Sequence, residues 1–293
     1  MDRLTRLEHR SLTLIREAIS TARNPGILWS IGKDSTAMLW LIRKAYLGTL
    51  PAPVLHVDTR YKFPEMIQFR NELARSWGFT LVTAENSEAL NAKETFPDGN
   101  ANRLTCCRNL KTEGLKGMIQ GTLPRRVLDL SSGSFVRYEN TDPFTTLFVA
   151  IRSDEEGTRS KERYFSPRSG TNTWNLDDQP PELWGYVNHD TPGARHVRVH
   201  PLLDWSERDV WDYIDREKIP LVKLYFDQGK GERYRSIGCF PCTFAVKSSA
   251  STVGQIVDEL GSGLLAGTSE RSGRAQDKDD EGGLETLRKD GYM

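Results

Sequence analysis

The chain has 293 residues, of which 37% are hydrophobic and 27% are charged, so it can bury a substantial core as one large domain or as one domain with an appendage. Its 40 basic and 40 acidic residues cancel to a formal net charge of zero, which excludes a global positive field that would hold a polyanion. No apolar run approaches the ~20 residues needed to span a bilayer, and the first residues are charged rather than signal-like, so we expect a cytoplasmic protein with no membrane segment.

Apolar runs alternate with helical patterns along the chain, which is typical of a parallel sheet with crossover helices. The predicted strands are residues 27–30, 54–58, 80–83 and 147–151. The clearest crossover helix spans residues 64–77, with a proline in its first turn and apolar residues spaced along one face. We therefore predict an α/β fold with helices on both faces of a parallel sheet. Ligands of such sheets bind beyond the carboxyl ends of the strands.

Three further segments complete the predicted organisation. Residues 122–146 carry three arginines among Ser, Gly and Pro without clear periodicity, so we expect an inserted loop. Ser206 is the predicted N-cap of another helix, with Asp209 completing a capping box. We expect one domain at residues 1–261. Residues 262–293 form a predicted C-terminal extension on the surface or against a partner, because they are rich in Gly, Asp, Arg and Lys.

The most informative motif is Ser-Ile-Gly-Lys-Asp-Ser at residues 30–35, between a predicted strand and a predicted helix. Backbone N–H groups of a glycine-containing turn, followed by the positive end of a helix, form an anion site, and Lys33 adds a mobile charge. A Walker A loop does not fit, because Gly26 lies one residue too far from Gly32 and Asp34 follows the lysine. The motif resembles the pyrophosphate loop of the ATP pyrophosphatases, which cut ATP between its α and β phosphates.

Other segments extend the resemblance along most of the chain. Together with the hexapeptide, residues 55–59, 111–115, 152–163, 181–184 and 268–271 are similar to the small subunit of bacterial sulfate adenylyltransferase. That family shares the adenine-nucleotide α-hydrolase fold of the phosphoadenylylsulfate reductases. The resemblance implies an enzyme that converts ATP and sulfate to adenylyl sulfate and pyrophosphate, with Mg²⁺ on the nucleotide and a GTPase as partner subunit.

The resemblance also implies roles for individual residues near the carboxyl ends of the strands. The predicted catalytic residues are Lys33, Asp34 and Arg152. The predicted nucleotide-binding residues are Ser30, Gly32, Lys33, Asp34, Ser35 and Asp58. Two alternatives stay open, because an Asp at a strand end such as Asp58 is also a common turn former and residues 152–156 also fit a solvated helix start.

All four cysteines fall into two pairs, Cys106-Cys107 and the Cys-x-x-Cys of Cys239 and Cys242. Four thiolates in such pairs can coordinate an iron–sulfur cluster or a zinc ion, or they can be inert. Neighbouring side chains diverge, which favours a larger cluster over a single zinc. The pattern is similar to that of adenylyl sulfate reductases, which carry a 4Fe-4S cluster. The C-terminal region, however, has no cysteine to serve as the nucleophile of a reductase.

This combination resembles ATP pyrophosphatases that work with a cysteine desulfurase to insert sulfur, including those of bacterial DNA phosphorothioation. Our leading hypothesis is that the protein adenylylates a phosphate oxygen of DNA, which sulfur delivered as persulfide then replaces. The cysteines would hold a cluster or relay sulfur. The alternatives are a sulfate adenylyltransferase small subunit, a reductase and a nucleotide-binding scaffold without turnover.

Overall fold

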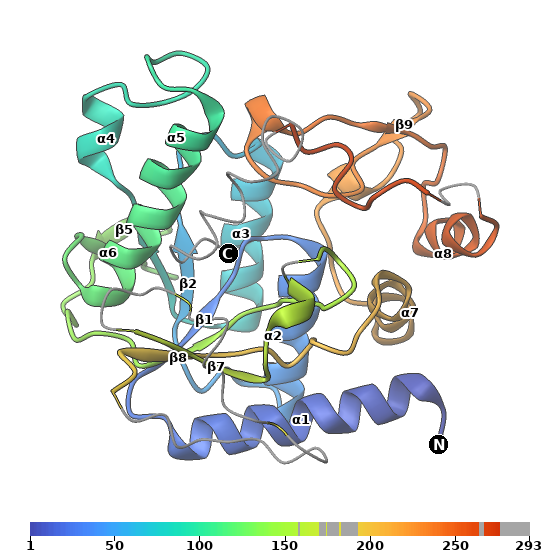
Figure 1. The fold of residues 1–293 in the computed structure, drawn as a ribbon, viewed down its shortest axis with the longest axis horizontal. Helices are drawn as coiled ribbons and strands as arrows, with labels where there is room; N and C mark the ends of the chain where they lie inside the picture. Colours follow the sequence, from blue (N-terminus) through green and yellow to red (C-terminus); the bar gives the residue numbers. More distant parts are fainter. Residues whose placement is uncertain (158, 170–173, 175–181, 183–192, 264–266, 276–293) are drawn as a thin grey trace.

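An eight-stranded mixed sheet forms the centre of the fold, with the strand order β5-β4-β3-β2-β1-β6-β8-β7 (Figure 1). The structure is a computed structural model that describes residues 1–157, 159–169, 174, 182, 193–263 and 267–275. The strands of the sheet are β1 (Pro25–Leu28), β2 (Val54–Val57), β3 (Leu81–Ala84), β4 (Arg125–Leu128), β5 (Phe135–Arg137), β6 (Thr146–Phe148), β7 (Phe165–Arg168) and β8 (His196–Val199). A separate two-stranded ribbon consists of β9 (Glu232–Arg233) and β10 (Val246–Lys247).

The central strands β3, β2, β1, β6 and β8 run parallel, whereas β4, β5 and β7 pair antiparallel at the two edges. Every residue of β2 and β3 is buried, as expected for parallel strands that are covered on both faces. The four predicted strands are present as β1, β2, β3 and β6, and the predicted fold class is confirmed. The strands β1 and β6 end earlier than predicted because the chain turns into loops after Leu28 and Phe148.

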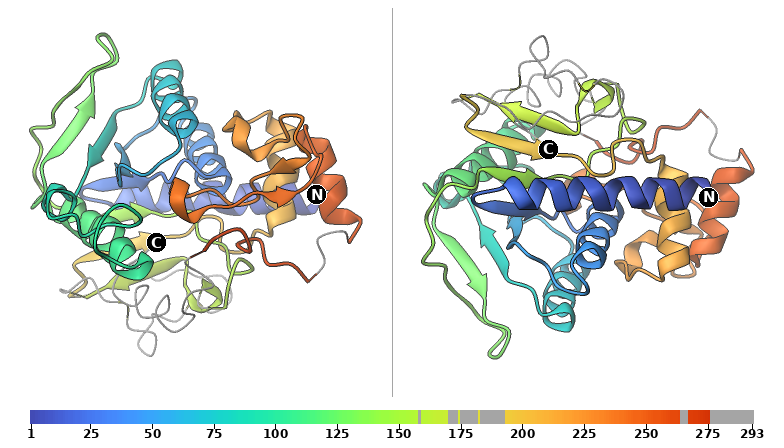
Figure 2. Two further views of the ribbon diagram at one scale, coloured as in Figure 1. Left: turned by 90° about the horizontal axis from the view of Figure 1, so that it is seen from above. Right: turned by 90° about the horizontal axis from the view of Figure 1, so that it is seen from below.

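Helices lie on both faces of the sheet, and α6 contacts β2 and β3 on the face opposite α3 (Figure 2). The α-helices are α1 (Arg3–Thr21), α2 (Lys33–Ala45), α3 (Pro64–Trp77), α4 (Ser87–Asn91), α5 (Arg103–Cys107), α6 (Gly114–Gln120), α7 (Glu207–Glu217) and α8 (Val253–Gly261). A π-helix, η1 (Arg108–Glu113), joins α5 to α6, and short 3-10 helices are η2 (Arg159–Lys161), η4 (Lys223–Tyr225) and η5 (Phe240–Cys242). No helix within the described ranges has the length and apolar character that a bilayer-spanning segment needs.

Local sequence signals explain how two of these helices begin and how one of them ends. Helix α3 begins with its proline in the first turn and ends at Gly78, whose φ of 66° is a left-handed conformation that glycine adopts readily. Its predicted span is confirmed. Helix α7 begins at the predicted capping box, because the Ser206 side chain accepts from the Asp209 backbone and the Asp209 side chain accepts from the Ser206 backbone.

The expectation of a loop without strands at residues 122–146 was wrong, because this segment contains β4 and β5. The two strands form a hairpin that continues the sheet from β3. Strands of three and four residues are too short to show a periodicity of two. Arg125 also conceals the alternation of apolar and polar residues that would indicate a strand. It is buried, and its guanidinium donates to main-chain carbonyls, including those of Met118 and Asn140.

The centre of the sheet contains the topological switch point. From β1 the chain passes to β2 and β3 on one side and returns to β6 on the other side, so the carboxyl ends of β1 and β6 border one crevice. The chain leaves β1 into residues 29–32 and leaves β6 into residues 149–152. Both predicted anion-binding loops therefore lie at the same place.

The C-terminal residues 267–275 pack against the body of the protein, although we expected them on the surface or against a partner. The backbone of Arg274 forms a bridge with Thr243, and the Ala275 amide donates to the Cys242 carbonyl at 3.1 Å. A Cβ at Gly238 would lie 2.1 Å from the Arg274 guanidinium, so a side chain there would have to displace that guanidinium. The rest of the predicted extension after residue 275 lies outside the described residues.

Candidate active site

The hexapeptide at residues 30–35 links β1 to α2 through a strained turn. Ile31 has a φ of 68°, a left-handed conformation that costs a β-branched residue on the order of 1–3 kcal/mol. Its side chain is fully buried, and this packing holds the turn in place. Gly32 is the N-cap of α2 without a side-chain cap. The N–H groups of the first turn of α2 are therefore presented at the switch point, where that of Lys33 donates to the Tyr225 hydroxyl.

Hydroxyl groups contact the donors of this loop. The Tyr225 hydroxyl accepts from the Lys33 amide at 2.9 Å, and the Ser30 hydroxyl accepts from the Gly32 amide at 3.4 Å. The Ser30 and Ser35 hydroxyl oxygens lie 3.1 Å apart. Burial raises the pKa of Tyr225, so its phenol stays neutral and keeps a proton to donate. The loop thus brings amides and hydroxyls together at the switch point, and its role as an anion site stays a prediction.

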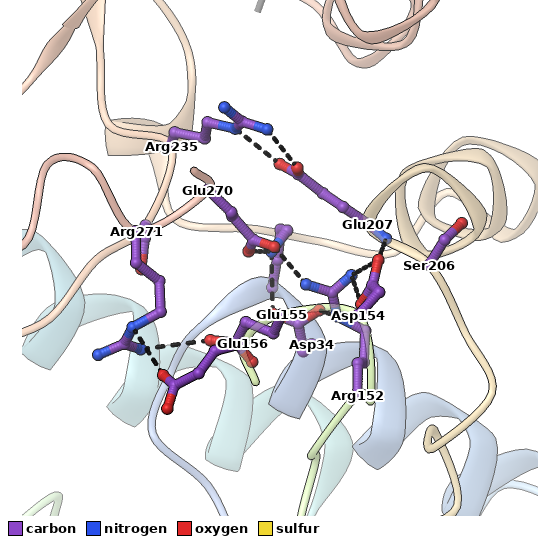
Figure 3. Close-up of polar contacts among 12 residues, drawn as sticks. Asp34, Arg152, Asp154, Glu155, Glu156, Ser206, Glu207, Arg235, Glu270 and Arg271 are labelled. Carbon is purple, nitrogen blue, oxygen red and sulfur yellow. Dashed lines mark hydrogen bonds and ion pairs between the residues drawn. The ribbon is translucent and has the colours of Figure 1, made fainter. Parts of the chain in front are cut away.

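The three predicted catalytic residues lie together in one buried ion-pair network (Figure 3). The Lys33 ammonium lies 2.9 Å from one Asp34 oxygen, and Nε of Arg152 lies 2.8 Å from the other. Arg152 is completely buried and also pairs with Asp154 at 3.1 Å. These carboxylates raise the pKa values of both cations although burial opposes this, so Lys33 and Arg152 stay charged.

Glu270, which the motifs did not identify as a site residue, is the centre of this network. Its carboxylate pairs with Lys33 through one oxygen and with Arg152 through the other (Figure 3). Burial raises the pKa of Glu270 to about 7; the two cations oppose this shift, while Glu207 and Asp34 reinforce it. Residues 268–271 were recognised only by resemblance, because no local pattern places a residue so distant in sequence beside Lys33.

A ring of further ion pairs surrounds the network. Glu155 binds both Arg159 and Arg271, the latter at 3.2 Å, and Glu207 at the start of α7 binds Arg235 at 2.7 Å. The cavity beside this ring has a volume of ≈ 140 Å³, below the about 300 Å³ at which ligand pockets begin. Its basic lining residues are Lys33, Lys62, Lys111, Arg159, Arg271 and Arg274. Glu270 also lines this cavity, which is smaller than a typical ligand site. Its lining is strongly basic.

Asp58 lies apart from the Lys33 loop. Its side chain accepts from the Arg60 amide at 2.9 Å and lies 3.7 Å from Arg70, in a second pocket. Burial alone would raise the pKa of Asp58, but neighbouring His56 and the Arg60 amide lower it. Of the predicted nucleotide-binding residues, Asp58 is thus the one whose side chain does not line the first cavity. The two pockets share Lys62 as a wall.

The two cysteine pairs come close to each other beside the first cavity. The Cys239 thiol lies 3.3 Å from the Thr59 hydroxyl, and the Lys111 ammonium lies 3.5 Å from the Cys107 sulfur. Electrostatic interactions link Cys239 with Cys106 and with Cys242. All four cysteines are free thiols.

The thiols differ in acidity and do not form a ready metal site. Burial opposes ionisation of Cys239, yet Lys111 and Lys62 lower its pKa to about 7. Burial raises the pKa of Cys106 to about 11. Within the described part of the chain, no group of three or more His, Cys, Asp or Glu residues is arranged to hold a metal ion. A 4Fe-4S cluster or a zinc ion on these cysteines therefore stays a prediction.

Comparison with known proteins identifies the family. Residues 24–245 match the family model of the phosphoadenosine phosphosulfate reductase domain. The chain belongs to this family. Within it, sulfate adenylyltransferase subunit 2 of Geotalea daltonii is 39% identical, with 99% of this chain and 98% of that relative covered. The protein of the same name from Aliivibrio fischeri is 36% identical, with 99% of this chain and 97% of that relative covered.

The solved structures agree with this membership. Phosphoadenylyl-sulfate reductase from Candida auris, in a phosphate complex, has a TM-score of 0.51 and 16% identity, covering 83% of this chain and 98% of its own. This likeness concerns the fold alone. It confirms that the chain has the fold of the phosphoadenosine phosphosulfate reductase domain family. The predicted resemblance to sulfate adenylyltransferase is confirmed, and the chain is an enzyme of the adenylyltransferase type.

Proposed function

We propose that the protein binds ATP at the switch point and transfers its adenylyl group to an oxyanion, releasing pyrophosphate. The observation that carries this proposal is the position of Glu270. A buried carboxylate that pairs with both Lys33 and Arg152, next to the open end of α2, occupies the place where a phosphate group would bind. Nucleotide binding replaces this carboxylate with phosphate oxygens.

Each residue of the network has a role in this reaction. Lys33 and the amides of the first turn of α2 stabilise the charge that develops on the departing pyrophosphate. Arg152 holds the α-phosphate or the attacking oxyanion. Asp34 accepts a hydrogen bond from Lys33 and forms an ion pair with Arg152, so it fixes the positions of both cations. Mg²⁺, which enters with ATP, neutralises charge on the triphosphate.

We propose sulfate as the acceptor. Relatives that match the whole chain at 36–39% identity are named sulfate adenylyltransferase subunit 2. That name also supports a partner subunit, which for the resembling family is a GTPase. The products would then be adenylyl sulfate and pyrophosphate.

A second candidate, sulfur incorporation into DNA with a cysteine desulfurase partner, is favoured by the cysteines. Lys62 and Lys111 line the cavity and also lower the pKa of the Cys239 thiol to about 7. A thiol that ionises near neutral pH can accept persulfide sulfur. No thiol outside these two pairs exists in the sequence, so a reductase would need one of them as its nucleophile.

Pyrophosphate release from Mg-ATP tests the proposal. We expect release that depends on sulfate, and a loss of at least a hundredfold in Lys33→Ala, because one donor to a developing charge contributes about 10²–10³ in rate. Lys116→Ala is the matched control, since that lysine pairs with Glu113 and lines neither pocket.

The outcomes separate the candidates. Pyrophosphate release that requires DNA and a desulfurase, and does not depend on sulfate, would favour sulfur incorporation into DNA. If no pyrophosphate forms with either acceptor and either partner, the protein is a nucleotide-binding scaffold and the proposed chemistry is wrong.

A further inference from the structure

A second pocket opens at the carboxyl ends of β2 and β3. It lies between α3 and the β4–β5 hairpin, and its volume of ≈ 300 Å³ is about twice that of the cavity beside Lys33. A volume of about 300 Å³ reaches the usual range of ligand sites. Its basic lining residues are Arg60, Lys62, Arg70 and Arg126, and its acidic ones are Asp58 and Glu85.

The carboxylates of this pocket do not satisfy its cations. Glu85 pairs with Arg60, and Asp58 approaches Arg70 Nη1 no closer than 3.7 Å. The side chain of Arg70 is only 3% exposed, and its Nη1 atom has no hydrogen-bond partner. A buried guanidinium N–H without an acceptor is costly, and a bound oxyanion would supply that acceptor.

Two further cations have no ion pair at all within the described residues. Lys62 lies between the two pockets, and burial lowers the pKa of its ammonium, with Lys111 and Arg274 adding to the shift. Arg126 extends from β4 into the second pocket, and no carboxylate or hydrogen-bond acceptor of the described chain contacts its guanidinium. Three arginines and Lys62 face two carboxylates, so the pocket is net positive even when the Lys62 ammonium loses its proton.

The hairpin itself keeps like charges together. Arg126 on β4 is directly opposite Arg137 on β5, and like charges in opposite positions of an antiparallel pair are destabilising. Arg137 has Glu139 within 3.7 Å and does not line the pocket. A bound anion would relieve the repulsion on Arg126, which gives this unfavourable pair a physical reason.

We propose that the second pocket is a binding site for a tetrahedral oxyanion, a phosphate or sulfate group. Arg70 and Lys62 contact it from within, and Arg126 closes over it from the hairpin. Two sources fit this chemistry, namely a free anion and a phosphodiester of a nucleic-acid strand. Arg70 and Arg126 do not line the cavity beside Lys33, whereas Lys62 lines both pockets and Asp58 lines this one.

Binding measurements without nucleotide test this site. Inorganic sulfate, inorganic phosphate and a short single-stranded DNA oligonucleotide are titrated calorimetrically into the wild-type full chain, Arg126→Gln and Arg137→Gln. Both substitutions change exposed side chains of the same hairpin, so their effects on folding are matched. Loss of a charged hydrogen bond weakens binding roughly tenfold or more.

We expect Arg126→Gln to weaken binding of at least one of these probes roughly tenfold, while Arg137→Gln stays within about twofold of the wild type. An effect on sulfate or phosphate identifies the free anion as the source, and an effect on the oligonucleotide alone identifies the phosphodiester. Equal affinities in all three proteins, or equal losses in both variants, would overturn the site. Pyrophosphate release by the same variants keeps this result separate from the ATP chemistry.

Discussion

In the proposed reaction, Glu270 controls the affinity of the first cavity for anions. It faces Lys33 and Asp34 on α2, Arg152 after β6 and Glu207 on α7, and its pKa is raised to about 7. Below that pH the carboxyl is protonated and releases its two cations. Above it, the carboxylate competes with any phosphate for them.

We therefore expect anion affinity to fall with rising pH in a way that Glu270→Gln removes. For a pKa of about 7, the competing carboxylate leaves only about a tenth of the molecules competent at pH 8, which weakens binding roughly tenfold relative to Glu270→Gln. At pH 6 the two proteins should bind alike. Titration with pyrophosphate at both pH values gives the ratio of the dissociation constants of the wild type and Glu270→Gln. Protonation of pyrophosphate itself affects both proteins equally and cancels in this ratio. A constant ratio would contradict the competition.

At the scale of elements, α7 is joined to the site through its first turn. The Asp154 side chain accepts from the Glu207 amide at 2.9 Å, next to the capping box of Ser206 and Asp209. The same helix end holds Arg235 through Glu207. The cap thus aligns an element that supports the network without touching the proposed phosphate position.

Ser206→Ala should lower the free energy of unfolding by about 1 kcal/mol, because an N-cap hydroxyl satisfies an otherwise unpaired N–H group. Catalysis should change little. Urea unfolding measures the first effect and pyrophosphate release the second. Ser206→Asp, which keeps a capping oxygen, should restore most of the stability, and a large catalytic defect in the alanine variant would mean that the cap also positions reacting groups.

For the whole molecule, Arg152 links segments that are far apart in the sequence. It is fully buried and pairs with Asp34 near the N-terminus, with its neighbour Asp154 and with Glu270 near the C-terminal end of the described chain. Removing the guanidinium leaves carboxylates buried without their partner.

Arg152→Ala should therefore destabilise the fold by about 3–5 kcal/mol. The exposed Arg137→Ala is the control, and it should stay within about 0.5 kcal/mol of the wild type. Chemical denaturation of both variants makes the comparison. A small change in Arg152→Ala would show that water reaches the network and compensates for the lost charge.

Local sequence signals predicted many of the helices and strands of this protein. The proline of α3, the capping box of α7 and the buried apolar runs of the central strands act over a few residues, so the sequence displays them directly. The hexapeptide at residues 30–35 likewise carries its own turn and helix start. The resemblance of the motifs along the chain predicted the family, which the comparisons confirm.

Local patterns and motifs in fixed order were enough to predict the fold class, the family and the turn at residues 30–35 between a strand and a helix. Three features became visible only in the folded chain: Glu270 lies between Lys33 and Arg152, Asp58 lines a second pocket, and β4 and β5 extend the sheet. These depend on contacts between distant segments. Such contacts leave no local periodicity, since packing and charge pairing in the folded chain choose the partners.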